Sequence, residues 1–323
     1  MDRYLYQKIY SLSDIMTTEI LKKNSVNFSH YAGALSICLR TSANKILKQV
    51  PERPIELGGE RRAFDLNVLV FESLRTILNK KEYEQESYTA METFSKYITR
   101  IDDIMDGPKH PKISEWNTQY RTDQKAMKIV SLFVRHIKSM ANQNIITQEQ
   151  ASEIFKATIQ YRKQARQAIK NFEENTNPNF QEILSIKNIT TGGMGAILAD
   201  IFCMCEGVAE NQRKTIREAF SNAFMATQIA DDIKDLKNDN DNGVPNIATA
   251  LIRQRYNDEI GVLNIEDMDI KTFRKLAPKS YSDLMLIGND YISMIPNTPY
   301  GLGVLKAMPS IFYKVIKLTS RGN

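Results

Sequence analysis

The sequence is poor in the residues that mark secreted, zinc-binding or loop-rich proteins. Its 323 residues include only 3 cysteines, 3 histidines, 14 glycines and 10 prolines. Cys38, Cys203 and Cys205 lack the spacing of zinc ligands, and so few thiols favour a reducing compartment such as the cytoplasm. The first residues contain no apolar signal region, and the most apolar runs are too short or carry an aspartate. We therefore expect a cytoplasmic protein without stable membrane insertion.

An excess of charge of one sign is also missing. The chain has 43 Lys and Arg against 38 Asp and Glu, a net charge of +5, and no basic tract stands out among them. This balance gives no indication of a nucleic-acid partner. Charged residues at 25% and hydrophobic residues at 42% are typical of a folded globular protein and exclude a disordered chain.

The two-residue alternation of exposed strands is absent, whereas helical periodicity covers most of the chain. Thr147 and Gln150 match a capping box at one helix start. Proline and glycine pairs separate the helical segments, but no linker separates two folding units. We therefore expect a single all-α domain over residues 1–323, an antiparallel helical bundle. Helices are predicted over residues 3–23, 64–78, 84–106, 123–141, 147–175, 179–206, 210–238 and 271–295.

Two acidic clusters repeat the pattern D-D-I-x-D. The first cluster consists of Asp102, Asp103 and Asp106, and the second cluster of Asp231, Asp232 and Asp235. At roughly 100° per residue, each set of three falls within an arc of about 100° on one helix face. Aspartate is a poor helix former and like charges repel, so neither cluster stabilises its own helix. We expect a cation to offset both.

Each acidic cluster follows an apolar helical run, which predicts two polar mouths that face each other above the bundle core. Carboxylates without nearby His or Cys suit a hard cation such as Mg²⁺, which commonly combines one or two carboxylates with substrate phosphates. A solvated acidic face is the alternative for one cluster alone. A calcium loop at 238–243 is disfavoured because its downstream glutamate is missing. The substrate is therefore expected to be phosphorylated.

Residues 92–106, ETFSKYITRIDDIMD, and 228–235, QIADDIKD, resemble the two aspartate-rich motifs of the trans-isoprenyl diphosphate synthase superfamily, which has the class I terpenoid synthase fold. The resemblance implies an all-α bundle around a central apolar cavity. It also implies an enzyme of isoprenoid biosynthesis that binds an allylic prenyl diphosphate. Three Mg²⁺ ions per site, with Mn²⁺ as a substitute, and a homodimer are implied as well.

The resemblance assigns roles to individual residues. The metal ligands are the six aspartates of the two clusters. The residues with a catalytic role are Asp102, Asp106, Asp231 and Lys187. The diphosphate-binding residues are Lys187, Gln228, Lys234 and Arg61. The cavity wall, which would shield an allylic carbocation from water, is formed by Phe94, Tyr97, Ile98, Phe224 and Met225.

Residues 58–64, GGERRAF, resemble the superfamily segment G-G-K-R-x-R-P that binds isopentenyl diphosphate, but with Glu60, Ala63 and Phe64 in place of Lys, Arg and Pro. Lysines at 109 and 112 stand where an arginine pair is usual, and a lysine does not reproduce the bidentate arginine fork. Gly243-Val244 replaces a Gly-Lys pair. The site for a second substrate is therefore degraded, which favours a terpene cyclase.

Three alternatives remain open. Other cations, such as Arg53 or Arg121, would allow a chain-elongating prenyltransferase. The tail over 295–313 faintly resembles squalene and phytoene synthases, which favours a head-to-head condensation. The Asn/Ser/Glu triad usual in cyclases is not visible, which counts against an ordinary terpene synthase. A non-catalytic regulatory subunit of a prenyl synthase is the third alternative, and two complete acidic clusters argue against it.

Overall fold

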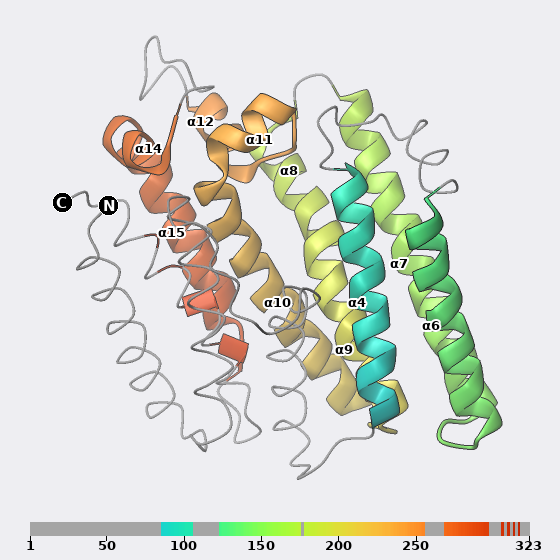
Figure 1. The fold of residues 1–323 in the computed structure, drawn as a ribbon. Coiled ribbons are helices and arrows are strands. Elements are labelled where there is room, and N and C mark those ends of the chain that lie inside the picture. The colour runs from blue at the N-terminus through green and yellow to red at the C-terminus, as the bar shows by residue number, and fades with distance from the viewer. Residues whose placement is uncertain are drawn as a thin grey trace, which may run out of the picture.

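The computed structural model describes residues 85–105, 123–175, 178–255 and 268–296, together with residues 305, 306, 309, 310, 313 and 316. These residues form helices joined by short turns, and they contain no strand (Figure 1). The predicted helices at 3–23 and 64–78 lie outside them. The elements are α4 (Gln85–Met105), α6 (Gln124–Asn142), α7 (Gln148–Glu174), α8 (Phe180–Lys187), the π-helical turn η1 (Asn188–Gly192), α9 (Gly193–Cys205), α10 (Glu210–Lys234), α11 (Leu236–Asn242), α12 (Ile247–Gln254), α14 (Ile270–Leu276) and α15 (Pro278–Ser293).

Side-chain caps define where several helices begin. The predicted capping box of Thr147 and Gln150 is confirmed at the start of α7, with both reciprocal hydrogen bonds present. Asn179 and Glu182 form a second capping box at α8. Asp123 accepts a hydrogen bond from the Ala126 amide at the start of α6. These caps satisfy backbone amides that lack partners within the first turn.

The helix α9 forms the centre of the described bundle. Every residue from Ile197 to Cys205 is buried, and α9 packs against α4, α7 and α10. An 18-residue window of Phe180–Cys205 has a mean hydropathy high enough for a membrane span, but 61% of that window is buried within the protein. A helix that is apolar all round is expected at the middle of a bundle. The α9 part of this segment is a buried core helix.

Small residues bring α9 and α10 close together. A Cβ atom at Gly195 would lie 2.7 Å from the Phe220 carbonyl oxygen and 2.8 Å from the Phe224 ring. A Cβ atom at Gly192 would lie 3.0 Å from both Met225 Cγ and Ser221 Oγ. Glycine at these two positions therefore sets the spacing between the two helices, since any side chain would push them apart.

The direction of the helices brings two helix ends to the same end of the bundle. Near the start of α4, Ser87 donates a hydrogen bond to Glu206, which follows the end of α9 and precedes α10. Near the other end of α4, Arg100 pairs with Asp123 at the start of α6. The helices α4 and α10 thus run in the same direction on either side of α9, and their C-terminal ends lie at one end of the bundle (Figure 1).

Two expected helices are interrupted in the structure. The helix predicted over 210–238 ends at Lys234, and Asp235 leaves the helical conformation before α11 begins. The side chain of Asn246 donates to the Asp232 carbonyl oxygen, the acceptor that residue 236 would use in a continuous helix. The helix predicted over 271–295 is divided into α14 and α15 because Pro278 disfavours a helical conformation at Ala277.

Candidate active site

The C-terminal end of α10 carries the second acidic cluster, and its three aspartates have different surroundings. The side chain of Asp232 is 1% exposed, whereas those of Asp231 and Asp235 are 48% and 26% exposed. Asp232 therefore points into the bundle, and the other two carboxylates face its end. One short motif provides both a buried anion and a more accessible pair of anions.

Asp232 is held by donors from three elements. The Ile247 amide donates to Oδ2 at 2.7 Å, Gln228 Nε2 donates to Oδ1 at 2.5 Å, and Lys187 Nζ lies 3.3 Å from Oδ1. Burial raises the pKa of this carboxyl group, while the Lys187 charge and the two hydrogen bonds oppose the rise. The sequence had identified Lys187, Gln228 and Asp232 separately, and the structure brings all three into contact.

The π-helical turn η1 (Asn188–Gly192) joins α8 to α9. Within it, Thr191 Oγ1 donates to Gln228 Oε1 at 2.9 Å, and the Thr190 carbonyl accepts from the Tyr161 hydroxyl at 2.8 Å. Turns of this kind occur mostly as single insertions in α-helices and often at functional sites. Here η1 follows Lys187 directly and links its helix to Gln228 on α10.

Lys234 lies between the two exposed carboxylates of the second cluster. Its ammonium group donates to Asp231 Oδ1 and lies 2.8 Å from Asp235 Oδ2, and the lysine side chain is only 14% exposed. Burial lowers the pKa of Lys234, but the two carboxylates outweigh this effect and raise it above its usual value. The lysine remains charged beside the acidic groups.

Asp239 and Asn246 belong to the same region and were missed in the sequence. Asn246 Nδ2 donates to the Asp232 carbonyl at 2.8 Å and to Asp239 Oδ2 at 2.7 Å, while its Oδ1 accepts from the Thr249 amide and caps α12. Burial raises the pKa of Asp239 to about 7, against the opposing Asn246 hydrogen bond. The helix-cap pattern at Asn246 was a usable signal, but its contact with Asp232 depends on the fold.

Half of the predicted site lies beyond what the structure describes. Asp102 and Asp103 fall in the last turn of α4, where only the backbone is described, and Asp106 and Arg61 lie outside the described residues. The ends of α4 and α10 nevertheless lie at the same end of the bundle (Figure 1). This arrangement is compatible with the prediction that the two acidic clusters face each other.

The residues predicted to form a cavity wall are packed in the core. Phe94, Tyr97, Phe224 and Met225 are each at most 4% exposed, and Ile98 is partly buried against the same core. Phe94 lies in an aromatic group, with ring centroids 5.5 Å from Phe133 and 6.1 Å from Tyr97. Their assignment as a cavity wall stays a prediction.

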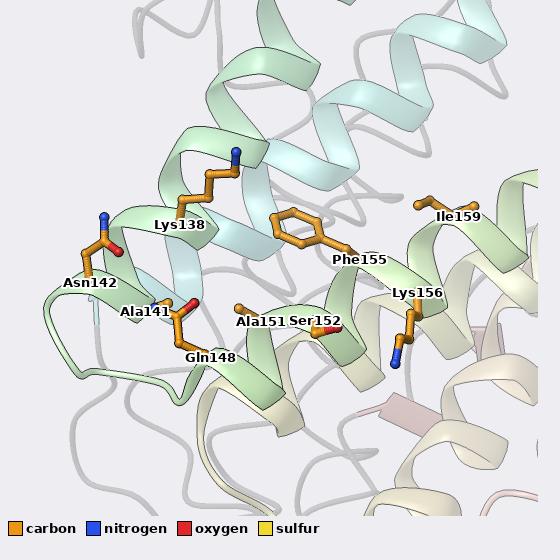
Figure 2. Close-up of a pocket in the computed structure, with 9 residues that line it drawn as sticks. All are labelled: Lys138, Ala141, Asn142, Gln148, Ala151, Ser152, Phe155, Lys156 and Ile159. Atoms are coloured by element: carbon orange, nitrogen blue, oxygen red, sulfur yellow. The ribbon is translucent and has the colours of Figure 1, made fainter.

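Two surface grooves of about 410 and 390 Å³ are not lined by residues of the second cluster. Figure 2 shows the larger one, which is lined by residues of α6 such as Lys138 and of α7 such as Phe155, whose ring points toward Lys138. The turn between α6 and α7 is at the opposite end of the bundle from α11 (Figure 1). The smaller groove lies between α7 and α8. Neither groove is lined by a predicted site residue.

The chemistry of the second cluster fits Mg²⁺. Its accessible donors are the carboxylate oxygens of Asp231 and Asp235, and magnesium commonly takes one or two carboxylates together with waters and phosphate oxygens. Within the described part of the chain, no three His, Cys, Asp or Glu side chains converge as a complete metal site. Further ligands would have to come from the first cluster or from substrate.

Comparison with known families identifies the chain. Residues 82–260, more than half of its length, match the model of terpene synthase family 2, C-terminal metal binding, and the chain belongs to this family. A search of curated proteins finds no match. The family and fold predicted from the two aspartate-rich motifs are confirmed, and the protein is an enzyme of isoprenoid biosynthesis that acts on isoprenyl diphosphates.

Two solved structures share the fold. A geranylgeranyl pyrophosphate synthetase from the archaeon Geoglobus acetivorans matches with a TM-score of 0.52 and 16% identity over 97% of this chain and 99% of its own. A geranylgeranyl pyrophosphate synthetase from Pyrococcus horikoshii matches with a TM-score of 0.51 and 16% identity over the whole of both chains. At this identity, the likeness shows that the helical fold is shared.

Proposed function

We propose that the protein is a Mg²⁺-dependent class I terpene cyclase that ionises an allylic prenyl diphosphate, releases diphosphate and closes the resulting carbocation into a terpene. The observation that carries this proposal is the cluster at the end of α10. There, the exposed carboxylates of Asp231 and Asp235 adjoin Asp232, which is paired with Lys187. Metal-binding anions and a cation suited to diphosphate thus occur within one site.

Asp231 and Asp235 would hold Mg²⁺ on one side, and Asp102 and Asp106 on the other. Bound Mg²⁺ would stabilise the negative charge that develops on the departing diphosphate. The side chain of Lys187 is 12% exposed, and a charge interaction is stronger in such a partly desolvated position than in bulk water. Lys234 and Arg61 would add positive charge.

The protein's other groups would orient the substrate and exclude water. Gln228, held by Thr191, fixes Asp232 and would help position the diphosphate. Apolar wall residues such as Phe94 and Phe224 would keep water from the carbocation, and aromatic faces would stabilise its charge. This division separates a charged end of the site from an apolar interior.

Cyclisation is favoured over chain elongation by the residues at the second-substrate position. Glu60 and Ala63 replace a Lys and an Arg in the superfamily segment that binds isopentenyl diphosphate, and Phe64 replaces its Pro. Val244 replaces a lysine, and its amide is bonded to the Asp239 carbonyl. A synthase that joins two substrates needs cations for both diphosphates, so their loss at one position supports a one-substrate reaction.

The wider proposal covers the whole protein. We propose one all-α domain over residues 1–323 that acts in the cytoplasm as a homodimer. Each active site would bind three Mg²⁺ ions, for which Mn²⁺ can substitute. The following experiment distinguishes a cyclase from three alternatives: an elongating synthase, a head-to-head synthase and a non-catalytic subunit.

The test uses purified protein with Mg²⁺ and geranyl, farnesyl or geranylgeranyl diphosphate, each with and without isopentenyl diphosphate. Gas chromatography with mass spectrometry of the extracts should show a hydrocarbon or terpene alcohol in the absence of isopentenyl diphosphate. Longer diphosphates formed only in its presence would establish elongation instead. A condensed product from two allylic molecules would indicate head-to-head coupling, and no product at all would favour the non-catalytic subunit.

Replacing one accessible carboxylate tests the residue assignment. Asp231→Ala should lower turnover by at least about 100-fold, because it removes a ligand needed to stabilise the developing charge. Asp241→Ala, at an exposed position on α11, is the matched control and should keep normal turnover. An Asp231→Ala enzyme with near-normal turnover would refute the metal assignment.

A further inference from the structure

Lys234 occupies the space between the two carboxylates that we assign to metal binding. Its ammonium contacts Asp231 Oδ1 and lies 2.8 Å from Asp235 Oδ2. The lysine side chain is more buried than either carboxylate. A cation belonging to the protein therefore already neutralises the oxygens that would face a divalent metal.

Another cation near this cluster, among the residues that the structure describes, has a different partner. Lys187, from α8, lies against Asp232, whose second oxygen is bonded to the Ile247 amide. Of these two lysines, Lys234 contacts the more accessible carboxylates of Asp231 and Asp235, and Lys187 contacts the buried carboxylate of Asp232. A lysine in the last turn of a helix also interacts favourably with the helix dipole. That contribution does not require contact with both aspartates.

We propose that Lys234 is an internal counterion that occupies the second acidic cluster in the metal-free enzyme and that Mg²⁺ must displace to bind. The proposal rests on the proposed function, since it takes Asp231 and Asp235 as metal ligands. An ammonium ion and Mg²⁺ repel each other when they share the same carboxylates, so the two occupants exclude each other. The lysine therefore weakens metal binding in the absence of substrate.

Displacement also links metal binding to diphosphate binding. An ammonium group released from two carboxylates loses its anionic partners at the mouth of the site. A diphosphate bound there would supply new ones. Diphosphate should therefore strengthen Mg²⁺ binding in part by accepting Lys234, and by linkage Mg²⁺ should strengthen diphosphate binding by the same factor.

The first test measures Mg²⁺ binding to the full-length protein by isothermal titration calorimetry, without substrate. Lys234→Met, which keeps the length and removes the charge, should bind Mg²⁺ about five- to twentyfold more tightly than wild type, as expected when a partly buried ion pair no longer competes. Lys234→Arg should restore the weaker binding. Lys214→Met, at an exposed position on the same helix, is the matched control and should resemble wild type.

Inorganic diphosphate provides the second readout. It should tighten Mg²⁺ binding more in wild type than in Lys234→Met, because only wild type has the ammonium to transfer. Equal Mg²⁺ affinity in wild type and Lys234→Met, or weaker binding in the variant, would overturn the proposal. Circular dichroism melting identifies any variant that fails to fold.

A measurement on the wild-type protein keeps the proposal testable even if the variants do not fold. Trace acetylation followed by peptide mass spectrometry should show that Mg²⁺ increases the labelling of Lys234 relative to Lys214. Unchanged relative labelling would contradict displacement. These readouts do not depend on turnover. A protein that shows them but makes no terpene would support the role of Lys234 as a counterion and contradict the proposed cyclase reaction. A protein that makes a terpene but does not show them would support the cyclase and contradict the counterion.

Discussion

The aspartates of the second acidic cluster have the same chemistry and different partners. Asp232 has both oxygens engaged by donors from the protein, whereas Asp231 is half exposed and shares Lys234 with Asp235. Two of Asp232's donors come from elements other than α10. The position of its side chain therefore depends on how α8 and α12 pack against α10. Asp232 therefore positions the cluster as much as it adds charge to it.

Removal of the Asp232 carboxylate should destabilise the fold. Asp232→Ala leaves the Lys187 ammonium and the Ile247 amide without this acceptor, and breaking a buried ion pair in this way should lower the free energy of unfolding by about 2–4 kcal/mol. Urea denaturation followed by circular dichroism at pH 7 measures the change. Asp241→Ala should alter it by less than about 0.5 kcal/mol. Equal stability of the two variants would show that the Lys187 pair has no net value.

At the residue scale, the sequence predicts which residues belong to the site better than it predicts the surroundings of each one. The D-D-I-x-D pattern was sufficient to identify Asp231, Asp232 and Asp235, because three adjacent like charges have no stabilising role in an isolated helix. It could not distinguish the buried carboxylate from the exposed ones. Asn246 lies 14 residues after Asp232, and its hydrogen bond to the Asp232 carbonyl forms only because the chain turns back after α11.

At the scale of elements, the contact between α9 and α10 controls the geometry of the second cluster. Gly195 allows the two helices to approach until the Phe220 carbonyl and the Phe224 ring meet the α9 backbone. Because α10 carries the acidic cluster at its end, a change in this spacing also moves the cluster relative to Lys187 and η1.

Gly195→Ala should lower the free energy of unfolding by about 1–3 kcal/mol, the usual cost of overpacking, because the new methyl group would press on backbone as well as on a ring. Gly193→Ala is the matched comparison. Its Cβ atom would lie 3.1 Å from the ring of Tyr161, a looser contact than the 2.7 Å to backbone at Gly195, and alanine favours a helix over glycine by about 1 kcal/mol. Thermal melting should therefore place Gly195→Ala below Gly193→Ala, and the opposite order would contradict the close-contact argument.

The periodicity of apolar residues predicts most helices of the described chain to within a few residues. The segments 84–106, 123–141 and 147–175 agree closely with α4, α6 and α7. The interruptions were harder to predict. The interruption at Asp235 involves a contact with Asn246, which is distant in the sequence, so local preference alone did not indicate it.

At the scale of the whole molecule, burial shifts the pKa of several described carboxyl groups in the same direction. Burial raises the pKa of Asp200, Asp232 and Asp239, the last to about 7. A raised pKa in the folded state means that the folded protein holds protons that the unfolded chain releases. Stability from these groups is greatest below the unfolded pKa near 4 and decreases as pH rises through the folded value.

Asp239 should therefore make the metal-free protein less stable as pH rises between about pH 4 and pH 7. Urea unfolding in EDTA-containing buffers at several pH values measures this slope. Asp239→Asn keeps an acceptor for Asn246 and removes the titrating group, so it should flatten the slope between about pH 4 and pH 7. Asp241→Asn should leave the slope unchanged. An increase of wild-type stability over this range would contradict the assignment.

The family could be predicted from two short motifs, and the all-helical architecture from the periodicity of the apolar residues. The meeting of the two motif helices at one end of the bundle required the fold. It depends on pairings such as Ser87 with Glu206 and Arg100 with Asp123, which link segments far apart in the sequence. Nothing local to residues 92–106 or 228–235 indicates those pairings.

The described contacts of Asp232 all close within residues 187–247, which is less than one fifth of the chain. Such a compact unit can be inherited intact while the flanking regions diverge. Related genes would then keep the diphosphate end of the site and vary the α4 part of the cavity wall, which carries Phe94, Tyr97 and Ile98, and the second-substrate segment 58–64 independently. Product diversity in such a lineage should accumulate in those flanking regions more than in this short stretch.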